Sequence, residues 1–212
     1  MIKKPTFLYE RELMANGYRA IVGVDEAGSG ALAGPVVAGA CILPLNSALG
    51  RLHDSKLLTH HMRDSLYEKI VAKATAWGVG LCDEEEIMYM GIRPATMLAM
   101  QRALDAVKDY DYVLVDAWTI PGLKMRQRGV IKGDQKIKSI AAASVIAKVT
   151  RDRMMAEFHK EFPHYGFDHN KGYGTVVHKA AIENFGPCRI HRLNYRPFEE
   201  FMKRPAPIVR KS

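Results

Sequence analysis

The stretch Gly23-Val24-Asp25-Glu26-Ala27-Gly28-Ser29-Gly30 carries more information than any other part of this chain. The apolar run 20–24 in front of the acids predicts a strand, which delivers two adjacent carboxylates into a glycine-rich loop. Adjacent side chains of an extended backbone diverge, so Asp25 and Glu26 cannot form a dyad by themselves. They can flank a divalent cation, which prefers oxygen ligands, and glycines allow a ligand to approach the backbone closely. The stretch therefore indicates a metal-assisted reaction on a phosphate ester.

The composition predicts a single soluble domain. The 212 residues are 48% hydrophobic and 25% charged, and no apolar run approaches the roughly 20 residues that span a bilayer. The N-terminus lacks the apolar stretch of a signal peptide, so we expect a cytoplasmic protein with no membrane role. Three cysteines without a CxxC pair predict reduced thiols rather than disulfides or a zinc site.

The charge distribution favours a polyanionic partner. The formal net charge is +8. Lysines and arginines crowd the segment 124–148 and continue to position 196, whereas acids gather at 83–86. A solvated basic surface is the alternative explanation of the charge. Because the basic residues are concentrated in one part of the chain, we favour nucleic acid as the partner.

Hydrophobic periodicity predicts alternating strands and helices. We expect strands at 20–25, 35–43, 75–81, 112–116 and 127–131, and helices at 6–16, 59–74, 94–107 and 139–162. A polar loop at 163–174 and one or two short helices follow. The strand 112–116 is apolar almost throughout, which is typical of a strand covered on both faces. The chain is therefore expected to form a mixed α/β sheet between layers of helices.

Four carboxylates are candidates for one cluster. Asp25 and Asp116 lie at or near the ends of two apolar strands, and neighbouring parallel strands bring such residues to one edge of a sheet. Glu26 follows Asp25, and Asp134 precedes the longest helix. An acid at a strand end is often a turn or cap residue, which is the alternative explanation for Asp134. Massed carboxylates repel one another, so the set demands cations, and two Mg²⁺ ions about 3.5–4 Å apart would support displacement at phosphorus.

Spaced blocks of the sequence resemble bacterial ribonuclease HII, and they run in the order of that family from residue 20 to residue 195. The blocks are Gly-Val-Asp-Glu-Ala-Gly at 23–28, Leu-Ala-Gly-Pro-Val-Val at 32–37, Asp-Ser-Lys at 54–56, Ala-Thr-Met-Leu-Ala-Met at 95–100, Val-Asp at 115–116, Lys-Gly-Asp at 132–134, Ala-Ala-Ser-Val-Ile-Ala-Lys-Val-Thr-Arg-Asp at 142–152 and His-Asn-Lys-Gly-Tyr at 169–173.

The resemblance implies an RNase H-like fold, with a mixed five-stranded sheet flanked by helices. It implies a catalytic domain at 1–180 and a small helical C-terminal extension at 181–212, which packs on the same domain and ends in a basic tail. It further implies a monomeric endonuclease that depends on Mg²⁺ or Mn²⁺. Such an enzyme cuts the RNA strand of RNA–DNA hybrids and cuts 5′ of ribonucleotides embedded in duplex DNA, leaving a 3′-hydroxyl and a 5′-phosphate. The four acids above match the metal ligands of the family, where one metal activates water and the other stabilises the leaving 3′-oxygen.

The resemblance also implies substrate contacts. Gly28, Ser29 and Gly30 match a tripeptide, usually Gly-Arg-Gly, whose backbone reads the ribose 2′-hydroxyl. Serine at the middle position removes a guanidinium that can contact phosphate. Lys56 lies in the Asp-Ser-Lys block and is expected to bind phosphate. Tyr173 matches a tyrosine that stacks on the sugar next to the ribonucleotide, with an ordinary loop tyrosine as the alternative.

One face of the longest helix is a candidate phosphate site. Ser144 and Lys148 lie four residues apart and therefore share a face, and Arg151 lies three residues further on. Because Asp134 immediately precedes this helix, the face can hold phosphates beside the metals. For Arg151 a solvated surface is the alternative.

Two departures from the family pattern keep other functions open. They are Ser29 and the segment Gly91-Ile92-Arg93, which replaces an Asn-Ile-Leu pattern. They motivate a second hypothesis, a hybrid- or duplex-binding protein with weakened catalysis, against which the intact set of acids argues. A third hypothesis is another RNase H-like nuclease, such as an exonuclease or strand-transfer enzyme, against which the 2′-hydroxyl-reading block argues.

Overall fold

The computed structural model describes residues 4–50, 52, 59–195 and 198. Its centre is a five-stranded sheet with the spatial order β3-β2-β1-β4-β5. The strands are β1 (Ile21–Ala27), β2 (Val36–Ile42), β3 (Ala76–Cys82), β4 (Tyr112–Asp116) and β5 (Gln127–Val130). β2 is antiparallel to both β1 and β3, whereas β1, β4 and β5 run parallel. The expected mixed sheet is confirmed.

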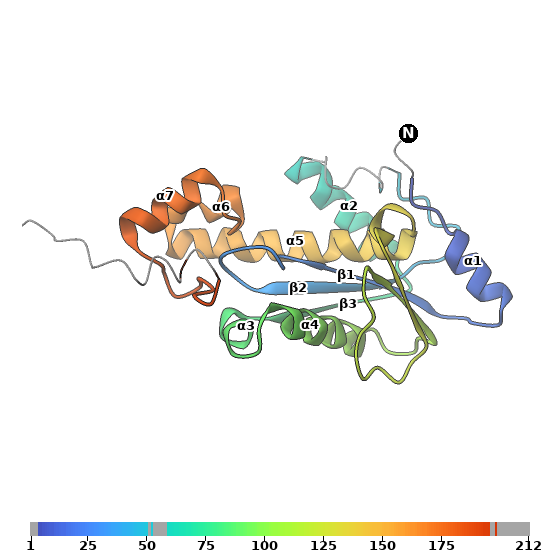
Figure 1. Ribbon diagram of the computed structural model, residues 1–212. Helices are drawn as coiled ribbons and strands as arrows, with labels where there is room; N and C mark the ends of the chain where they lie inside the picture. Colours follow the sequence, from blue (N-terminus) through green and yellow to red (C-terminus); the bar gives the residue numbers. More distant parts are fainter. Residues whose placement is uncertain (1–3, 51, 53–58, 196–197, 199–212) are drawn as a thin grey trace, which may run out of the picture.

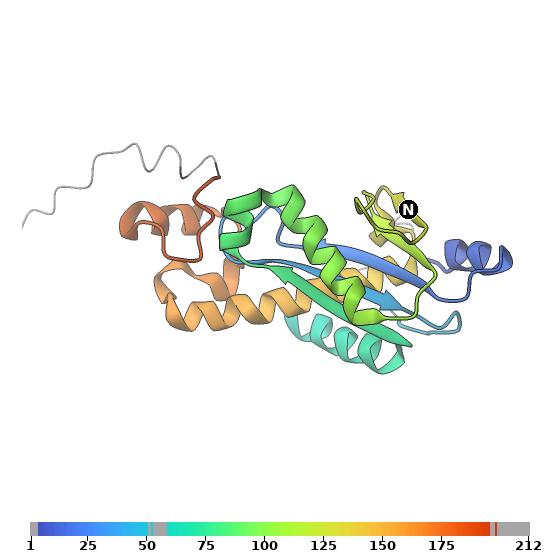
Figure 2. The same ribbon diagram turned by 90° about the horizontal axis from the view of Figure 1, so that it is seen from below.

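Helices cover both faces of the sheet. They are α1 (Leu8–Ala15), α2 (His60–Lys73), α3 (Glu84–Met90), α4 (Ile92–Val107), α5 (Lys138–Glu161), α6 (Phe167–Asn170) and α7 (Val176–Phe185), with 3₁₀ turns at Gly133–Gln135 and Pro163–Tyr165. α5 lies along one face with α2 beside it, and α3 and α4 cover the other face (Figures 1 and 2). α1 lies at one end of the molecule and α6 and α7 lie at the other (Figure 1).

Two glycines allow α5 to pack directly on the sheet. A Cβ atom at Gly23 of β1 would collide with the backbone of Ser139, and one at Gly39 of β2 would collide with the carbonyl group of Ala143. The opposing surface of α5 is also small, because Ala141, Ala142, Ala143 and Ala147 are all buried there. Helix and strand backbones therefore approach closely, which brings the middle of α5 to the acidic end of β1.

The first correction to the expected boundaries concerns β1, which continues through Ala27. Asp25 and Glu26 therefore lie in the strand and not in a loop. The reason is the antiparallel ladder with β2, which pairs Asp25 with Gly39 and continues to Ala27 opposite Val37. Pairing of this kind depends on the partner strand, so the local sequence does not reveal where the strand ends.

Two further segments differ from expectation. The unpredicted helix α3 begins with a capping box, in which Asp83 accepts from the Glu86 backbone at 2.9 Å and Glu86 accepts from the Asp83 backbone at 3.2 Å. The pattern Asp-x-x-Glu was the available signal for this helix. The segment 163–174 is not only a polar loop, since it contains a 3₁₀ turn and α6. The side chain of Phe167 is completely buried and holds α6 against the core.

The C-terminal part of the described chain packs on the rest of the domain. α7 crosses position 180, and Ala181, Ile182 and Phe198 share a buried cluster with Leu32 and Met155. The division at residue 180 stays a prediction. Cys41, Cys82 and Cys188 are free thiols. Among the helices of the described residues, none combines the length and apolar character needed to cross a membrane.

Candidate active site

Three of the predicted acids meet at one edge of the sheet. Val24 of β1 is the register partner of Val115 of β4, so Asp25 and Asp116 follow at the same edge. Asp25 is only 6% exposed, and Glu26 is half-buried. The backbone N–H of Glu26 donates to Oδ1 of Asp25 at 2.8 Å. The parallel pairing of two separate strands thus creates a carboxylate cluster that neither strand has alone.

Burial and mutual repulsion disfavour ionisation of this cluster. The pKa of Asp25 is raised well above its usual value by burial and by the charges of Glu26 and Asp116, while a hydrogen bond from Ser144 acts in the opposite direction. Burial raises the pKa of Glu26 as well, followed by the charge of Asp116. A bound cation would relieve this repulsion.

The fourth acid is brought close to this edge by a turn. Oδ1 of Asp116 accepts from the backbone N–H of Gly133 at 2.6 Å. Asp134 is the next residue, in the 3₁₀ turn that precedes α5, and it is half-buried. The link between the two acids therefore runs through the backbone of the Lys-Gly-Asp block.

The chemistry of the four acids fits hard divalent cations, since all their ligand atoms are oxygens with excess negative charge. In the described residues, no group of three or more His, Cys, Asp or Glu side chains is arranged to hold a metal ion as it stands. In this arrangement Asp25 accepts hydrogen bonds from the backbone of Glu26 and from Ser144, and Asp116 accepts one from the backbone of Gly133.

A pocket of about 320 Å³ opens beside the acids. Its lining includes Glu26, Gly28, Ser29, Ser144, Lys148 and Tyr173. The ammonium group of Lys148 is 2.7 Å from Oδ1 of Asp152 and lies 5.5 Å from the centroid of the Tyr173 ring. The structure therefore brings five of the predicted substrate-binding residues together around one cavity.

The glycine-rich loop has three positions with different constraints. Gly28 has φ +90°, and a Cβ atom there would collide with the guanidinium of Arg151. The hydroxyl of Ser29 donates to Oε1 of Glu26 at 3.4 Å. Gly30 is exposed, and a Cβ atom there would meet nothing within 4 Å. Only Gly28 is therefore required to be glycine by its fold, whereas Gly30 leaves open space for an approaching ligand.

The structure contradicts both explanations of Arg151, as a phosphate contact and as a solvated residue. Arg151 is fully buried, and its guanidinium donates to the carbonyl groups of Ala33 at 3.0 Å, Pro35 at 2.9 Å and Lys171 at 2.8 Å. It therefore ties together the two segments that carry Gly28 and Tyr173. The tertiary structure alone brings these three carbonyl groups around position 151 of α5.

Arg192 has a similar role on the other side of the loop. It is fully buried, donates twice to the carbonyl of Gly34 at 2.9 and 2.7 Å, and donates to the carbonyl of Ala31 at 2.8 Å. Two buried arginines thus fix the loop that follows the acidic strand. Buried guanidinium groups need several acceptors, and the irregular backbone of this loop supplies them.

One pocket residue was not predicted, and one predicted residue lies outside the described residues. Arg63 of α2 lines the pocket, and one of its nitrogens is 3.5 Å from Oδ2 of Asp152. No signal in α2 singled out this arginine, because its partner is 89 positions away. Lys56 belongs to the segment that the structure does not describe.

A series of hydrogen bonds through two histidines ends at the backbone carbonyl group of Tyr173. The backbone N–H of Cys188 donates to Nδ1 of His191 at 2.9 Å, the two Nε2 atoms of His191 and His178 are 3.0 Å apart, and Nδ1 of His178 is 2.9 Å from the carbonyl oxygen of Tyr173. Because the first donor is a backbone amide, the other protons are fixed: His191 donates from Nε2 and His178 donates from Nδ1 to Tyr173. Both histidines are therefore neutral.

Because these hydrogen bonds need both histidines to be neutral, we expect the folded protein to lose stability in acid. Burial, followed by the proximity of His178, lowers the pKa of His191 to about 4 from 6.5, and burial lowers the pKa of His178. A base with a depressed pKa contributes stability above its unfolded pKa that is lost as the pH falls. We expect the free energy of unfolding in urea to drop by about 2 kcal/mol between neutral pH and about pH 5 on account of His191.

The control is a variant with His178→Gln and His191→Gln, which should be less stable at neutral pH but should lose much less stability on acidification. An equal acid response in both proteins would show that other groups cause it.

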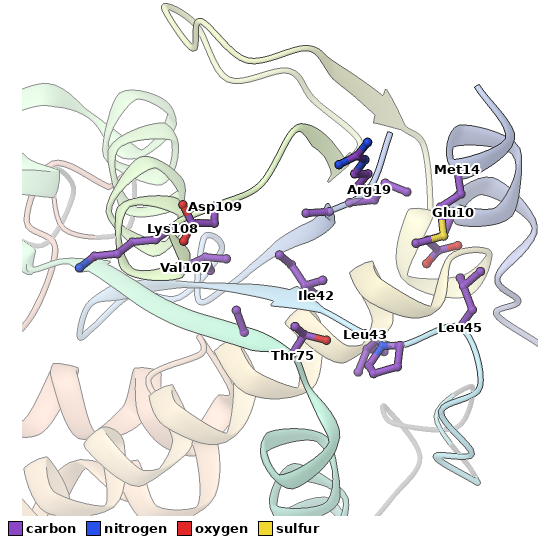
Figure 3. A pocket seen from close by; sticks show the side chains of 14 residues that line it. Glu10, Met14, Arg19, Ile42, Leu43, Leu45, Thr75, Val107, Lys108 and Asp109 are labelled. Carbon is purple, nitrogen blue, oxygen red and sulfur yellow. The ribbon is translucent and has the colours of Figure 1, made fainter. Parts of the chain in front are cut away.

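A second pocket, of about 490 Å³, is lined by Ala20 and Ile21 and therefore lies at the opposite end of β1 from the acids. Figure 3 shows the side chains that line it. Glu10 of α1 lines it and also accepts from the backbone and hydroxyl groups of Ser139 at 3.0 and 2.9 Å. These bonds cap the first turn of α5, whose own N-cap residue, Ile137, supplies no side-chain cap. This pocket contains none of the predicted site residues, and the capping of α5 explains the presence of Glu10 in it.

Solved structures with the same architecture come from ribonucleases H. The ribonuclease H2 from Pyrococcus horikoshii superposes with a TM-score of 0.73 at 24% identity, covering 88% of this chain and 100% of that chain. A Bst-RNase HIII in complex with Mn²⁺ gives a TM-score of 0.71 at 17% identity, over 94% of this chain and 73% of that chain. At these identities the similarity establishes the fold, which is RNase H-like.

Sequence comparisons are more specific. The family model Ribonuclease HII matches residues 22–197. The ribonuclease HII of Geotalea daltonii is 48% identical over 204 residues, which are 95% of this chain and 94% of the relative. That of Syntrophotalea carbinolica is 45% identical over 195 residues, 92% and 93% of the two chains.

Fold and comparisons together define this protein as an enzyme of the ribonuclease H class. Within that class, the chain belongs to the ribonuclease HII family.

Proposed function

We propose that this ribonuclease H is a divalent-metal-dependent endonuclease. It hydrolyses the RNA strand of RNA–DNA hybrids and cuts 5′ of ribonucleotides embedded in duplex DNA, leaving a 3′-hydroxyl and a 5′-phosphate. The observation that carries the proposal is the meeting of Asp25, Glu26 and Asp116 beside a pocket lined by Ser29, Lys148 and Tyr173.

In this proposal, Asp25, Glu26, Asp116 and Asp134 hold two Mg²⁺ or Mn²⁺ ions. The bound ions supply activation of the attacking water and stabilisation of the leaving oxygen. In this proposal the backbone of residues 28–30 exchanges hydrogen bonds with a ribose 2′-hydroxyl, and the open space at Gly30 supports it, because a ligand can approach the backbone there. This contact distinguishes ribonucleotides from deoxyribonucleotides.

The pocket residues orient the substrate. The Lys148 ammonium is a donor for a phosphate oxygen, and its ion pair with Asp152 keeps it beside the Tyr173 ring. The Tyr173 ring offers a surface on which a sugar can stack, and the bond from His178 to its carbonyl group fixes its position. Ser144 donates to Asp25, which keeps that carboxylate oriented before a cation binds.

The test uses purified protein and three labelled duplexes: one with a single ribonucleotide, one RNA–DNA hybrid and one of DNA alone. We expect cleavage of the first two only when Mg²⁺ or Mn²⁺ is present, and none of the DNA duplex. Binding without cleavage in either metal would favour the alternative of a hybrid-binding protein, and cleavage of all-DNA would favour another RNase H-like nuclease.

The neutral residue at position 29 gives a separate prediction. Ser29→Arg is expected to tighten binding of a ribonucleotide-containing duplex by at most about 1.5–3 kcal/mol, because a guanidinium at this pocket can pair with a phosphate. The gain should shrink as salt is raised. Fluorescence anisotropy of a labelled duplex measures it, and Ser29→Gln, which adds bulk without charge, is the control. Unchanged affinity of Ser29→Arg at low salt would show that the pocket directs the guanidinium elsewhere, for example to Glu26.

A further inference from the structure

An exposed arginine and an exposed tryptophan stack on one another near the acidic edge. The guanidinium carbon of Arg93 lies 4.4 Å from the centroid of the Trp118 ring. Trp118 is 49% exposed although it is one of the largest apolar side chains, and Arg93 is also exposed. Neither residue belongs to the pocket described above.

The backbone holds Trp118 in a fixed position two residues beyond Asp116. Ala117 has φ +59°, and the backbone N–H of Trp118 donates to the carbonyl oxygen of Asp116 at 2.7 Å. A Cβ atom at Gly129 of β5 would lie 2.6 Å from the carbonyl oxygen of Trp118, so this strand position has no room for a side chain. The tight turn therefore sets the indole beside the acid-bearing end of β4.

The charge of Arg93 has no acidic partner among the described residues. Within the part of the chain that the structure describes, Arg93 forms no ion pair, and its recorded partner is the indole ring. Among the described residues, exposed Arg128, which lies over Tyr9, resembles Arg93 in this respect, whereas two other exposed arginines that stack on rings differ. Arg153 lies over Tyr67 and pairs with Asp64 at 3.0 Å, and Arg189 lies over Phe162 and pairs with Glu161 at 2.7 Å.

We propose that Arg93 and Trp118 form a second contact for the nucleic-acid duplex, beyond the pocket at Tyr173. Arg93 donates to a phosphate of a strand that passes the acidic edge, and the free surface of Trp118 packs against a sugar or base of the same strand. An aromatic ring gives sequence-tolerant stacking, and a guanidinium held flat on that ring keeps its edge N–H groups for the phosphate. The inference rests on the proposed function, since it adds a contact to the same substrate.

The two tryptophans of the chain provide a direct test. Trp77 lies in the edge strand β3, which β2 and β1 separate from β4, and it contacts Tyr67. Trp77→Phe leaves Trp118 as the single fluorophore, and Trp118→Phe leaves Trp77. Both variants also carry Asp25→Asn, so that the duplex is not cut during the titration. Each is titrated with a ribonucleotide-containing duplex, and anisotropy of a labelled copy of that duplex measures binding independently.

The expected result is that the fluorescence of Trp118 changes along the binding curve, while that of Trp77 stays constant. Binding with no response of Trp118 would overturn this inference alone. Absence of binding together with absence of cleavage by the unmodified protein would overturn the proposed function and this inference with it.

Substitutions supply a second measurement. Trp118→Ala is expected to weaken duplex binding about tenfold, as for the loss of one stacked base. Arg93→Gln should weaken binding and lower the slope of log affinity against log salt by about one, as for the loss of one phosphate contact. The matched control is Trp77→Ala, which should leave affinity unchanged. Circular dichroism checks that each variant is folded, and equal affinities of folded Trp118→Ala, Trp77→Ala and unmodified protein would overturn the proposal.

Discussion

Asp25→Asn is expected to lower cleavage of a ribonucleotide-containing duplex by about a thousandfold or more while leaving the protein folded. The amide keeps the shape of the side chain and can still accept from the Glu26 backbone, so the β1–β4 edge should persist. It removes a negative charge from the set of acids proposed to hold cations. Initial rates at saturating metal measure the effect, and Asp116→Asn should behave in the same way.

The matched control is Asp109→Asn. Asp109 is an exposed acid that lines the pocket at the other end of β1, so its loss should leave the rate unchanged (Figure 3). Retention of more than about a tenth of the rate in folded Asp25→Asn would rule out the proposed role of this acid, because losing metal catalysis costs several kcal/mol.

Arg151→Ala is expected to have the largest effect on stability, a loss of at least about 3 kcal/mol in the free energy of unfolding. The change leaves the carbonyl groups of Ala33, Pro35 and Lys171 without this buried donor and opens a cavity beside Gly28. Arg151→Lys should recover little, since an ammonium cannot reproduce three donors in a planar fork. Urea unfolding followed by circular dichroism measures both.

Arg153→Ala is the control on the same helix. Arg153 is exposed and pairs with Asp64 and Glu68 at the surface, so its loss should cost no more than about 1 kcal/mol. Similar small losses for Arg151→Ala and Arg153→Ala would contradict the role given to the buried guanidinium.

The elements predicted best from sequence are those with strong local patterns. The expected helix 139–162 corresponds to α5 (Lys138–Glu161), and the apolar strand 112–116 corresponds to β4 in full. The expected helix 59–74 corresponds to α2 (His60–Lys73), where the side chain of Thr59 caps the first turn by accepting from the Met62 backbone. Helical periodicity, continuous apolarity and capping are properties of neighbouring residues, so a single sequence contains them.

The meeting of Asp25 and Asp116 was also predictable, but for a different reason. Parallel strands in a covered sheet present their carboxyl ends at one edge, so two strand-end acids are expected to meet there even when the chain between them is long. The position of Asp134 near these two acids depends on one further contact, the hydrogen bond from the Gly133 backbone to Asp116. The sequence does not specify that contact.

The sequence by itself therefore determined the ribonuclease HII resemblance, the mixed sheet and the acidic edge. Only the tertiary structure decided what the polar residues outside that edge do. Arg151 and Arg192 sit in sequence patterns that look like exposed charges, yet both are buried because irregular backbone from distant segments surrounds them with carbonyl acceptors. Conversely, Trp118 is exposed because a turn after Asp116 and a glycine on β5 hold it at the surface. The environment of a side chain depends on which distant backbone folds against it, and that information is not local.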